Sequence, residues 1–241
     1  MNIIPLILFS PNFILIAAAV IPAIYLLFYV YKHDRLEKES TGLLVKLVIM
    51  GILSTLLAQV TETLGIAALP YVCKAGSTGY YLLLFYVVVG LSEEGFKYLL
   101  LKKNTWNNLE YNCQFDGVVY AVFVSLGFAL WENISYVLSY GFSTALARAV
   151  TAIPGHACFG VFMGAFYGAA KRLDLEGDAK RSKKVRRLSV LVPMLLHGTY
   201  DFFASSDKSY GTWVFVAFVI SMFIVAYRLV KQLSAKDRYI R

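Results

Sequence analysis

Long apolar stretches, separated by short polar segments, make up most of this chain. A helix that crosses a membrane needs about 20 mainly apolar residues in a row. The stretches that reach or approach this length are Ile3–Tyr31, Leu43–Leu69, Tyr80–Leu101, Asp116–Tyr140, Ala145–Ala170, Leu188–Ala204 and Tyr210–Leu229. The pattern therefore predicts an all-α, polytopic integral membrane bundle with about seven transmembrane helices.

The composition agrees with this class. Of 241 residues, 59% are hydrophobic and only 16% are charged, and the mean hydropathy is +0.62. Such values are typical of polytopic membrane proteins, and they leave almost no sequence for a soluble domain. We expect residues 1–241 to form a single membrane domain, with the first helix retained because it lacks the basic start of a signal peptide. The three cysteines fall at different depths, so no disulfide framework or cysteine metal site is expected.

The basic residues lie mainly on one side of the predicted helices. Of the 23 Lys and Arg residues, 18 follow the first, third, fifth and seventh stretches. Cytoplasmic loops retain positive charge, so the N-terminus is predicted outside and the C-terminus in the cytoplasm. The net charge of +8 is then explained by topology and by contact with anionic lipid, and no nucleic-acid partner is expected. The basic insertion KRLDLEGDAKRSKKVRR is predicted to be a mobile linker.

Charged and titratable residues interrupt four of these stretches. A single Asp, Lys or Arg at the centre of a membrane helix costs about 2.5–3.5 kcal/mol. Residues that face one another inside a bundle avoid much of this cost, which predicts a buried polar site. Its candidates are Glu93, Glu94, Lys97, Glu132, Arg148, His156, His197 and Asp201.

The acid pair Glu93 and Glu94 precedes Lys97 by four and three residues, so a helix brings both carboxylates near one ammonium. One acid of such a pair is suited to taking a proton from water. The alternative is an ion pair that only holds helices together. On the next stretch Glu132 is too deep to be a helix cap, whereas Asp116 is expected to cap its helix, and Gly127 allows close helix approach.

Gly160, Gly164 and Gly168 follow His156 at intervals of four residues, so the histidine lies on the same helical face as a stripe of small residues. A stripe of small residues packs against another helix, so His156 is expected to face protein rather than lipid. Pro154 just before it is expected to loosen the helix.

His197 and Asp201 are four residues apart, so the carboxylate is placed to orient the imidazole. Arg148 is expected to supply a counter-charge or a substrate anchor. Nothing local distinguishes Gln59 and Glu62, which are not included in the predicted site.

Two histidines and a glutamate suit zinc, which accepts imidazole and carboxylate ligands, and Glu132, His156 and His197 are the candidate ligands. The same groups also act without metal, one glutamate as base and the histidines stabilising an oxyanion. Spacing alone leaves both alternatives open.

Four motifs in one order, SEEGFK, FDGVVYAVFVSLGFALWENISY, RAVTAIPGHACFG and HGTYDF, resemble the PrsW family of bacterial intramembrane proteases. This family is related to the CAAX-protease and bacteriocin-processing group that includes the Ras-converting endoprotease. The resemblance covers residues from about Val89 to Phe203. It implies catalysis by Glu93, Glu94, His156 and His197, with the polar site completed by Glu132 and Asp201. Apart from the resemblance, Lys97, Asn133 and Arg148 are expected to bind substrate or to give electrostatic support.

The resemblance also implies a reaction and a location. The reaction is cleavage of a membrane-anchored protein such as an anti-sigma factor. The location is a bacterial plasma membrane. The catalytic core is expected at about 80–204. Helices 3–31, 43–69 and 210–229 would flank that core. The rival hypotheses are a proton-coupled transporter and a non-catalytic membrane scaffold, because intramembrane Glu, His and Lys also form proton relays. The sequence does not determine the oligomeric state.

Overall fold

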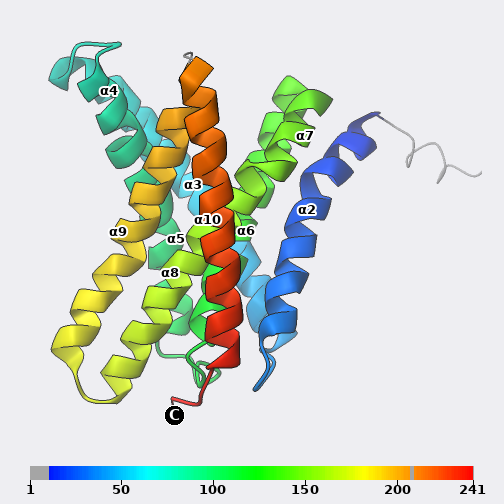
Figure 1. Ribbon diagram of the computed structural model, residues 1–241, viewed down its shortest axis with the longest axis vertical. Coiled ribbons are helices and arrows are strands. Elements are labelled where there is room, and N and C mark those ends of the chain that lie inside the picture. Colours follow the sequence, from blue (N-terminus) through cyan, green and yellow to red (C-terminus); the bar gives the residue numbers. More distant parts are fainter. Residues whose placement is uncertain (1–10, 207–208, 241) are drawn as a thin grey trace, which may run out of the picture.

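The computed structural model describes residues 11–206 and 209–240. Within these ranges the regular secondary structure is helical, and the long helices run lengthwise through one bundle (Figure 1). In chain order the helices are α2 (Pro11–His33), α3 (Thr41–Val72), α4 (Thr78–Leu82), the π-helix η1 (Leu83–Leu91), α5 (Ser92–Thr105), α6 (Asp116–Tyr140), α7 (Phe142–Val150), α8 (Ala152–Leu175), α9 (Ala179–Ala204) and α10 (Ser209–Ala235). The predicted all-α membrane bundle is confirmed.

Five helical segments of the described chain are long and apolar enough to cross a membrane. They are Leu15–His33, Thr41–Val72, Asp116–Tyr140, Phe142–Leu175 and Gly211–Ala235. Of the other two predicted stretches, the third forms α4, η1 and α5, and the sixth forms part of α9. Both carry charged residues, which lower their mean hydropathy although they lie within the same bundle (Figure 1). Five of the seven predicted stretches therefore coincide with described helices that are long and apolar enough to cross a membrane.

Several boundaries differ from those predicted. The predicted start of the first helix at Ile3 lies outside the described residues, and α2 continues through Pro22. The third stretch is divided into α4, η1 and α5, and the fifth is broken at Thr151 between α7 and α8. Pro154 therefore lies in the first turn of α8, where the missing N–H of a proline removes no helical hydrogen bond.

The expectation of a mobile linker between the fifth and sixth stretches is wrong. Helix α8 extends to Leu175 and α9 already begins at Ala179, so most of the basic insertion is helical. The Asp178 side chain accepts a hydrogen bond from the Arg181 backbone N–H at 2.9 Å and caps α9. Lys and Arg are good helix formers, and a capped start is sufficient to extend the helix beyond the apolar region.

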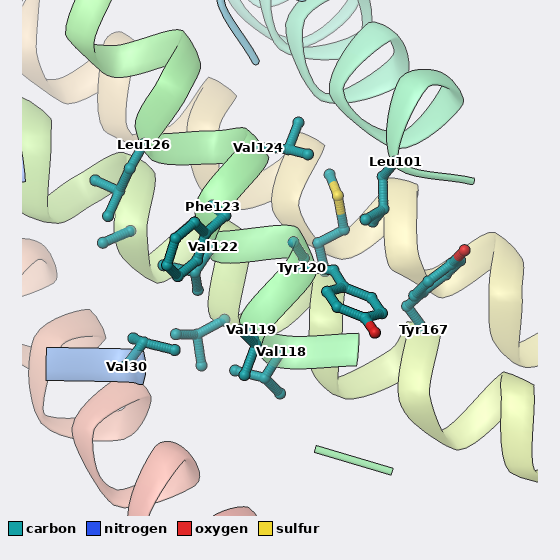
Figure 2. Close-up of a cluster of buried hydrophobic side chains, with 14 of the residues drawn as sticks. Val30, Leu101, Val118, Val119, Tyr120, Val122, Phe123, Val124, Leu126 and Tyr167 are labelled. Atoms are coloured by element: carbon teal, nitrogen blue, oxygen red, sulfur yellow. The ribbon is translucent and has the colours of Figure 1, made fainter. Parts of the chain in front are cut away.

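Helix α6 is at the centre of the bundle. Its residues from Asp116 to Ala129 are buried, and it packs against α8, α3 and α2. Figure 2 shows its apolar side chains together with Val30, Leu101 and Tyr167 from the surrounding helices. A helix enclosed on all sides needs apolar residues all round, which explains why no polar face interrupts its first half.

Glycines allow α6 to approach its neighbours. A Cβ on Gly127 would lie 2.2 Å from the carbonyl oxygen of Val48 on α3, and one on Gly164 of α8 would lie 2.4 Å from the carbonyl oxygen of Gly117. Real Cβ atoms do not approach so closely, so only glycine fits at these crossings. The predicted close contact at Gly127 and the predicted packing stripe on α8 are both confirmed.

Asp116 has a structural role, but it does not cap α6 as predicted. Its Oδ2 accepts hydrogen bonds from the backbone N–H groups of Asn112 at 3.0 Å and Cys113 at 2.7 Å. Asp116 is the first residue of α6 and therefore holds the preceding loop instead of the helix start.

Candidate active site

Lys97 of α5 lies at the centre of a buried polar cluster. Its ammonium is 2.7 Å from Oε1 of Glu94, 3.2 Å from Oε2 of Glu93 and 3.2 Å from Nδ1 of His156. It also lies over the ring of Phe128, 3.8 Å from the centroid. The helical spacing predicted from the sequence thus brings both acids to one ammonium, and α8 adds a histidine to the same group.

Both ring nitrogens of His156 have partners. An ammonium has only donors, so Nδ1 accepts from Lys97, and Nε2 carries the proton that it donates to Oε2 of Glu132 at 2.9 Å. The hydroxyl of Ser125 on α6 donates to the backbone carbonyl of His156 at 2.7 Å. His156 is buried against protein, as predicted, and its ring orientation is set from two sides.

His197 of α9 also belongs to the cluster. Its Nδ1 is 3.0 Å from Oε1 of Glu94, and its Nε2 is 3.5 Å from Oδ2 of Asp201. Its ring lies 5.3 Å from that of His156 and stacks on Phe159 at 4.8 Å. The closest carboxylate partner of His197 is therefore Glu94 on another helix, and the predicted contact with Asp201 is longer.

Arg148 at the end of α7 pairs with α6. It donates from Nη2 to Oε2 of Glu132 at 2.8 Å and from Nε to Oδ1 of Asn133 at 2.9 Å. Asn133 in turn donates to the backbone carbonyl of Ala19 on α2 at 3.0 Å. The guanidinium also lies over the ring of Tyr136 at 4.0 Å. Arg148 thus has the counter-charge geometry expected of it, and one carboxylate oxygen of Glu132 is shared by Arg148 and His156.

A cavity of about 570 Å³ opens beside this cluster. Polar and apolar residues of α3, η1, α5, α6, α7 and α9 line it. Most of them lie in the part of each helix that is away from the basic connections. The residues are Thr55, Gln59, Glu62, Ile66, Leu84, Phe85, Val89, Glu93, Phe128, Glu132, Tyr136, Arg148, His197, Asp201, Ala204 and Ser205. Glu93 therefore faces the cavity, whereas Glu94, which does not line it, lies behind.

The lining includes Gln59 and Glu62, the two polar residues that were considered from the sequence and not included in the predicted site. Thr55, Gln59 and Glu62 follow one another at intervals of four and three, which places them on one face of α3. Glu62 Oε1 is buried and has no hydrogen-bond partner. This spacing could have identified them from the sequence. Polar residues on one face of an apolar helix are expected to face the interior of the bundle rather than lipid.

The donor set of the cluster fits a metal ion. Glu93, Glu94, His156 and His197 each offer a ligand atom, and these atoms lie within 4.8 Å of one another. Oε2 of Glu94 is buried and has no partner. This group differs from the predicted ligand set of Glu132, His156 and His197. Glu132 is not part of it and instead accepts a hydrogen bond from Nε2 of His156. The ammonium of Lys97 currently engages Glu93, Glu94 and His156, so it competes for the same lone pairs.

The chain is similar to known proteins over most of its length. Residues 39–228 match the family described as "PrsW family intramembrane metalloprotease". The chain is 32% identical over 226 residues to "Protease PrsW" of Halalkalibacterium halodurans, covering 94% of this chain and 100% of that protein. It is 30% identical over 226 residues to "Protease PrsW" of Bacillus subtilis, covering 93% and 97% of the two chains.

A search of solved structures found no match. The family match covers most of the chain and includes every helix that contributes to the polar cluster. The same helices provide the buried Glu and His group that can hold a metal ion. This protein therefore belongs to the PrsW family of intramembrane metalloproteases.

Proposed function

We propose that this protease hydrolyses a peptide bond of a membrane-anchored protein at the cluster of Glu93, Glu94, His156 and His197. The observation that carries the proposal is the convergence of these four residues, from three helices, within 4.8 Å. A structural ion pair would need no cavity, but here the cluster borders one of about 570 Å³. Water and an extended peptide can meet Glu93 and His197 there.

Glu93 is the proposed general base. It lines the cavity, and its Oε2 lies 3.2 Å from the ammonium of Lys97, which holds the carboxylate in place. A water in the cavity can donate to this carboxylate, lose its proton to it and attack the peptide carbonyl. The proton then passes to the leaving amine, so that Glu93 is restored.

Glu94 and His197 are proposed to stabilise the reacting group. Glu94 holds Nδ1 of His197 at 3.0 Å, which leaves Nε2, near Asp201, as the nitrogen directed to the reaction. A protonated Nε2 donates to the developing oxyanion. If Glu93, Glu94, His156 and His197 hold zinc, the ion supplies Lewis-acid polarisation at the same place.

Glu132, Asn133 and Arg148 are proposed to position the substrate and His156. Glu132 accepts from Nε2 of His156, and this contact fixes the tautomer of the imidazole. Arg148 balances the charge of Glu132 and lines the cavity, where its guanidinium can meet a peptide carbonyl. In this arrangement Lys97 tunes the acid pair, and Arg148 lies at the margin.

We infer the membrane placement from charge. The ends of α5 and α8 have basic last turns, and Lys236 and Arg238 follow the end of α10. These three helix ends lie together at the end of the bundle where the C-terminus is marked (Figure 1). That end is proposed to face the cytoplasm of a bacterial cell, with the N-terminus outside. The cavity is lined from the opposite helix ends, so the peptide would enter from the outer half of the plasma membrane. Residues 1–241 act as one membrane domain, with the catalytic core at about 80–204.

The substrate class is proposed from the family resemblance. A membrane-anchored regulator of the anti-sigma-factor type fits an enzyme whose cavity lies within a bundle of spanning helices. A proton-coupled transporter and a non-catalytic scaffold are not favoured, because the chain belongs to a protease family and its acids border a cavity.

Site variants test the proposal. Glu93→Gln, Glu94→Gln and His197→Ala would each be purified, checked for folding by thermal unfolding and assayed in liposomes on a membrane-tethered reporter. General bases contribute about 10²–10⁴-fold, so cleavage is expected to fall by at least 100-fold in Glu93→Gln. Glu176→Gln, which removes a surface acid, is the matched control. Full cleavage by all three folded variants would overturn the proposal.

A further inference from the structure

A separate, strongly basic pocket lies between α5 and α9, near the ends that carry the basic connections. Its volume is about 400 Å³. Its lining consists of four cations and three less polar side chains, namely Tyr98, Lys102, Lys183, Arg186, Arg187, Val190 and Leu191. None of these residues lines the cavity of the candidate active site.

The lining is ordered along both helices. On α9 the cations Lys183, Arg186 and Arg187 are spaced by three and four residues and share one face, which Val190 and Leu191 continue one turn deeper. On α5, which runs in the opposite direction, Tyr98 lies one turn deeper than Lys102. Both walls therefore change from charged to apolar in the same direction, as a phospholipid does from headgroup to acyl chain.

The positive charge of the pocket is not neutralised by protein. In the described part of the chain no acid lies within salt-bridge distance of the four cations. The nearby acids Glu176 and Asp178 pair instead with Arg172 and Arg181. Arg186 rests on the ring of Trp106 at 4.8 Å, which positions its guanidinium without cancelling its charge.

We propose that this pocket binds one anionic phospholipid, with its phosphate among the four cations and its acyl chains along Tyr98, Val190 and Leu191. Basic pockets between transmembrane helices on the cytoplasmic side take such headgroups. Four cations without acids favour a lipid with net negative charge over a zwitterionic one. The bound lipid joins α5, which carries Glu93 and Glu94, to α9, which carries His197.

Trp106 gives a direct readout of binding. The double variant Trp131→Phe and Trp213→Phe removes the two other tryptophans, both of which are exposed, and leaves Trp106 as the reporter. The full chain in detergent would be titrated with phosphatidylglycerol while Trp106 emission is followed. A headgroup that draws Arg186 from the ring changes this emission. Parallel titrations would use phosphatidylcholine, sodium phosphate and a poly-glutamate peptide.

Two triple variants separate the pocket from general surface charge. The pocket triple is Lys102→Gln, Lys183→Gln and Arg186→Gln. The control triple, Lys103→Gln, Lys180→Gln and Lys184→Gln, removes the same charge from the same two helices outside the pocket. Because Arg186 is part of the readout, the single variant Lys102→Gln and lipid retained through purification, measured by mass spectrometry, provide independent measures.

A saturable response to phosphatidylglycerol is expected, with affinity on the order of 100-fold weaker in the pocket triple and unchanged in the control. Lys102→Gln is expected to weaken it about fivefold. Equal affinity in both triples would overturn the proposal, because the binding would then be diffuse. An equal response to phosphatidylcholine, to sodium phosphate or to poly-glutamate would overturn it too, by pointing to an apolar groove, a free-anion site or a protein-binding surface.

Discussion

The ammonium of Lys97 and Nδ1 of His156 lie 3.2 Å apart and connect α5 to α8. With Glu93 and Glu94 as its other acceptors, Lys97 uses all three of its N–H donors on groups that can also be metal ligands. A metal ion needs those same lone pairs. The side chain of Lys97 and a bound metal therefore act as competing counter-charges for the acid pair.

Replacing Lys97 tests this competition. Lys97→Met leaves two adjacent buried carboxylates without their cation, and loss of one partner of a buried pair costs about 3–5 kcal/mol. The melting temperature is expected to fall by about 10 °C. Added zinc is expected to raise the melting temperature more in the variant than in the unaltered protein, and metal analysis should find more retained zinc. Lys46→Met, on an exposed part of α3, is the control. Equal zinc responses in both proteins would contradict the competition.

Glu62 gives a second prediction. It lines the cavity, but no hydrogen bond connects it to Lys97, His156 or His197 in the described structure. Glu62→Gln keeps the shape of the side chain and removes a charge that the bilayer disfavours. Cleavage of the reporter is expected to stay within about tenfold, and the melting temperature is expected not to fall. A loss as complete as that of Glu93→Gln would instead place Glu62 among the groups that contact the reacting atoms.

The α6–α8 crossing gives a third prediction. A methyl group on Gly164 would lie 2.4 Å from the Gly117 carbonyl oxygen, so Gly164→Ala must push the helices apart. Overpacking costs about 1–3 kcal/mol, which lowers the melting temperature by about 2–10 °C. Gly42→Ala on α3 meets nothing within 4 Å and is expected to stabilise slightly. Identical melting curves for the two alanine variants would show that the crossing tolerates a side chain.

Asp34, in the connection between α2 and α3, predicts a pH dependence. Burial raises the pKa of its carboxyl from 3.8 to about 6. The positive charge of Lys38 lowers this pKa, whereas the negative charges of Asp237 and Glu37 raise it further. A raised acid pKa means that the folded state holds the proton more tightly. Stability contributed by the neutral form is therefore complete below about pH 4 and is lost as the pH rises through 6.

Asp34→Asn removes that titration. The variant is expected to melt about 2–4 °C higher than the unaltered protein at pH 8, and the difference should shrink to nearly nothing at pH 4. Burial raises the pKa of Glu39 to about 7, and the charge of Asp34 adds to this. Removing that charge lowers the pKa of Glu39, which stabilises the variant further at pH 8, in the same direction as the loss of the Asp34 titration. Thermal unfolding at five pH values checks the prediction. A difference that is the same at pH 4 and pH 8 would contradict it.

Much of the cluster could be predicted from local spacing and cost. Glu93, Glu94 and Lys97 lie on one short helical segment, so their proximity follows from the rise of an α-helix alone. The meeting of residues from different helices was inferred only from the cost of burying charges singly. That reasoning predicted a shared site, but it could not distinguish the closer Glu94–His197 contact from the His197–Asp201 contact.

The sequence by itself determined the membrane class, most of the apolar spans and the set of polar residues that must avoid lipid, because hydropathy and helical period are local properties. Only the tertiary structure decided that Glu93 faces the cavity, that Glu62 joins its lining and that Glu132 meets His156 rather than the acid pair. These contacts depend on how far each helix is rotated and shifted against its neighbours. Close packing at positions such as Gly127 and Gly164 sets that rotation, and it involves residues far apart in the chain.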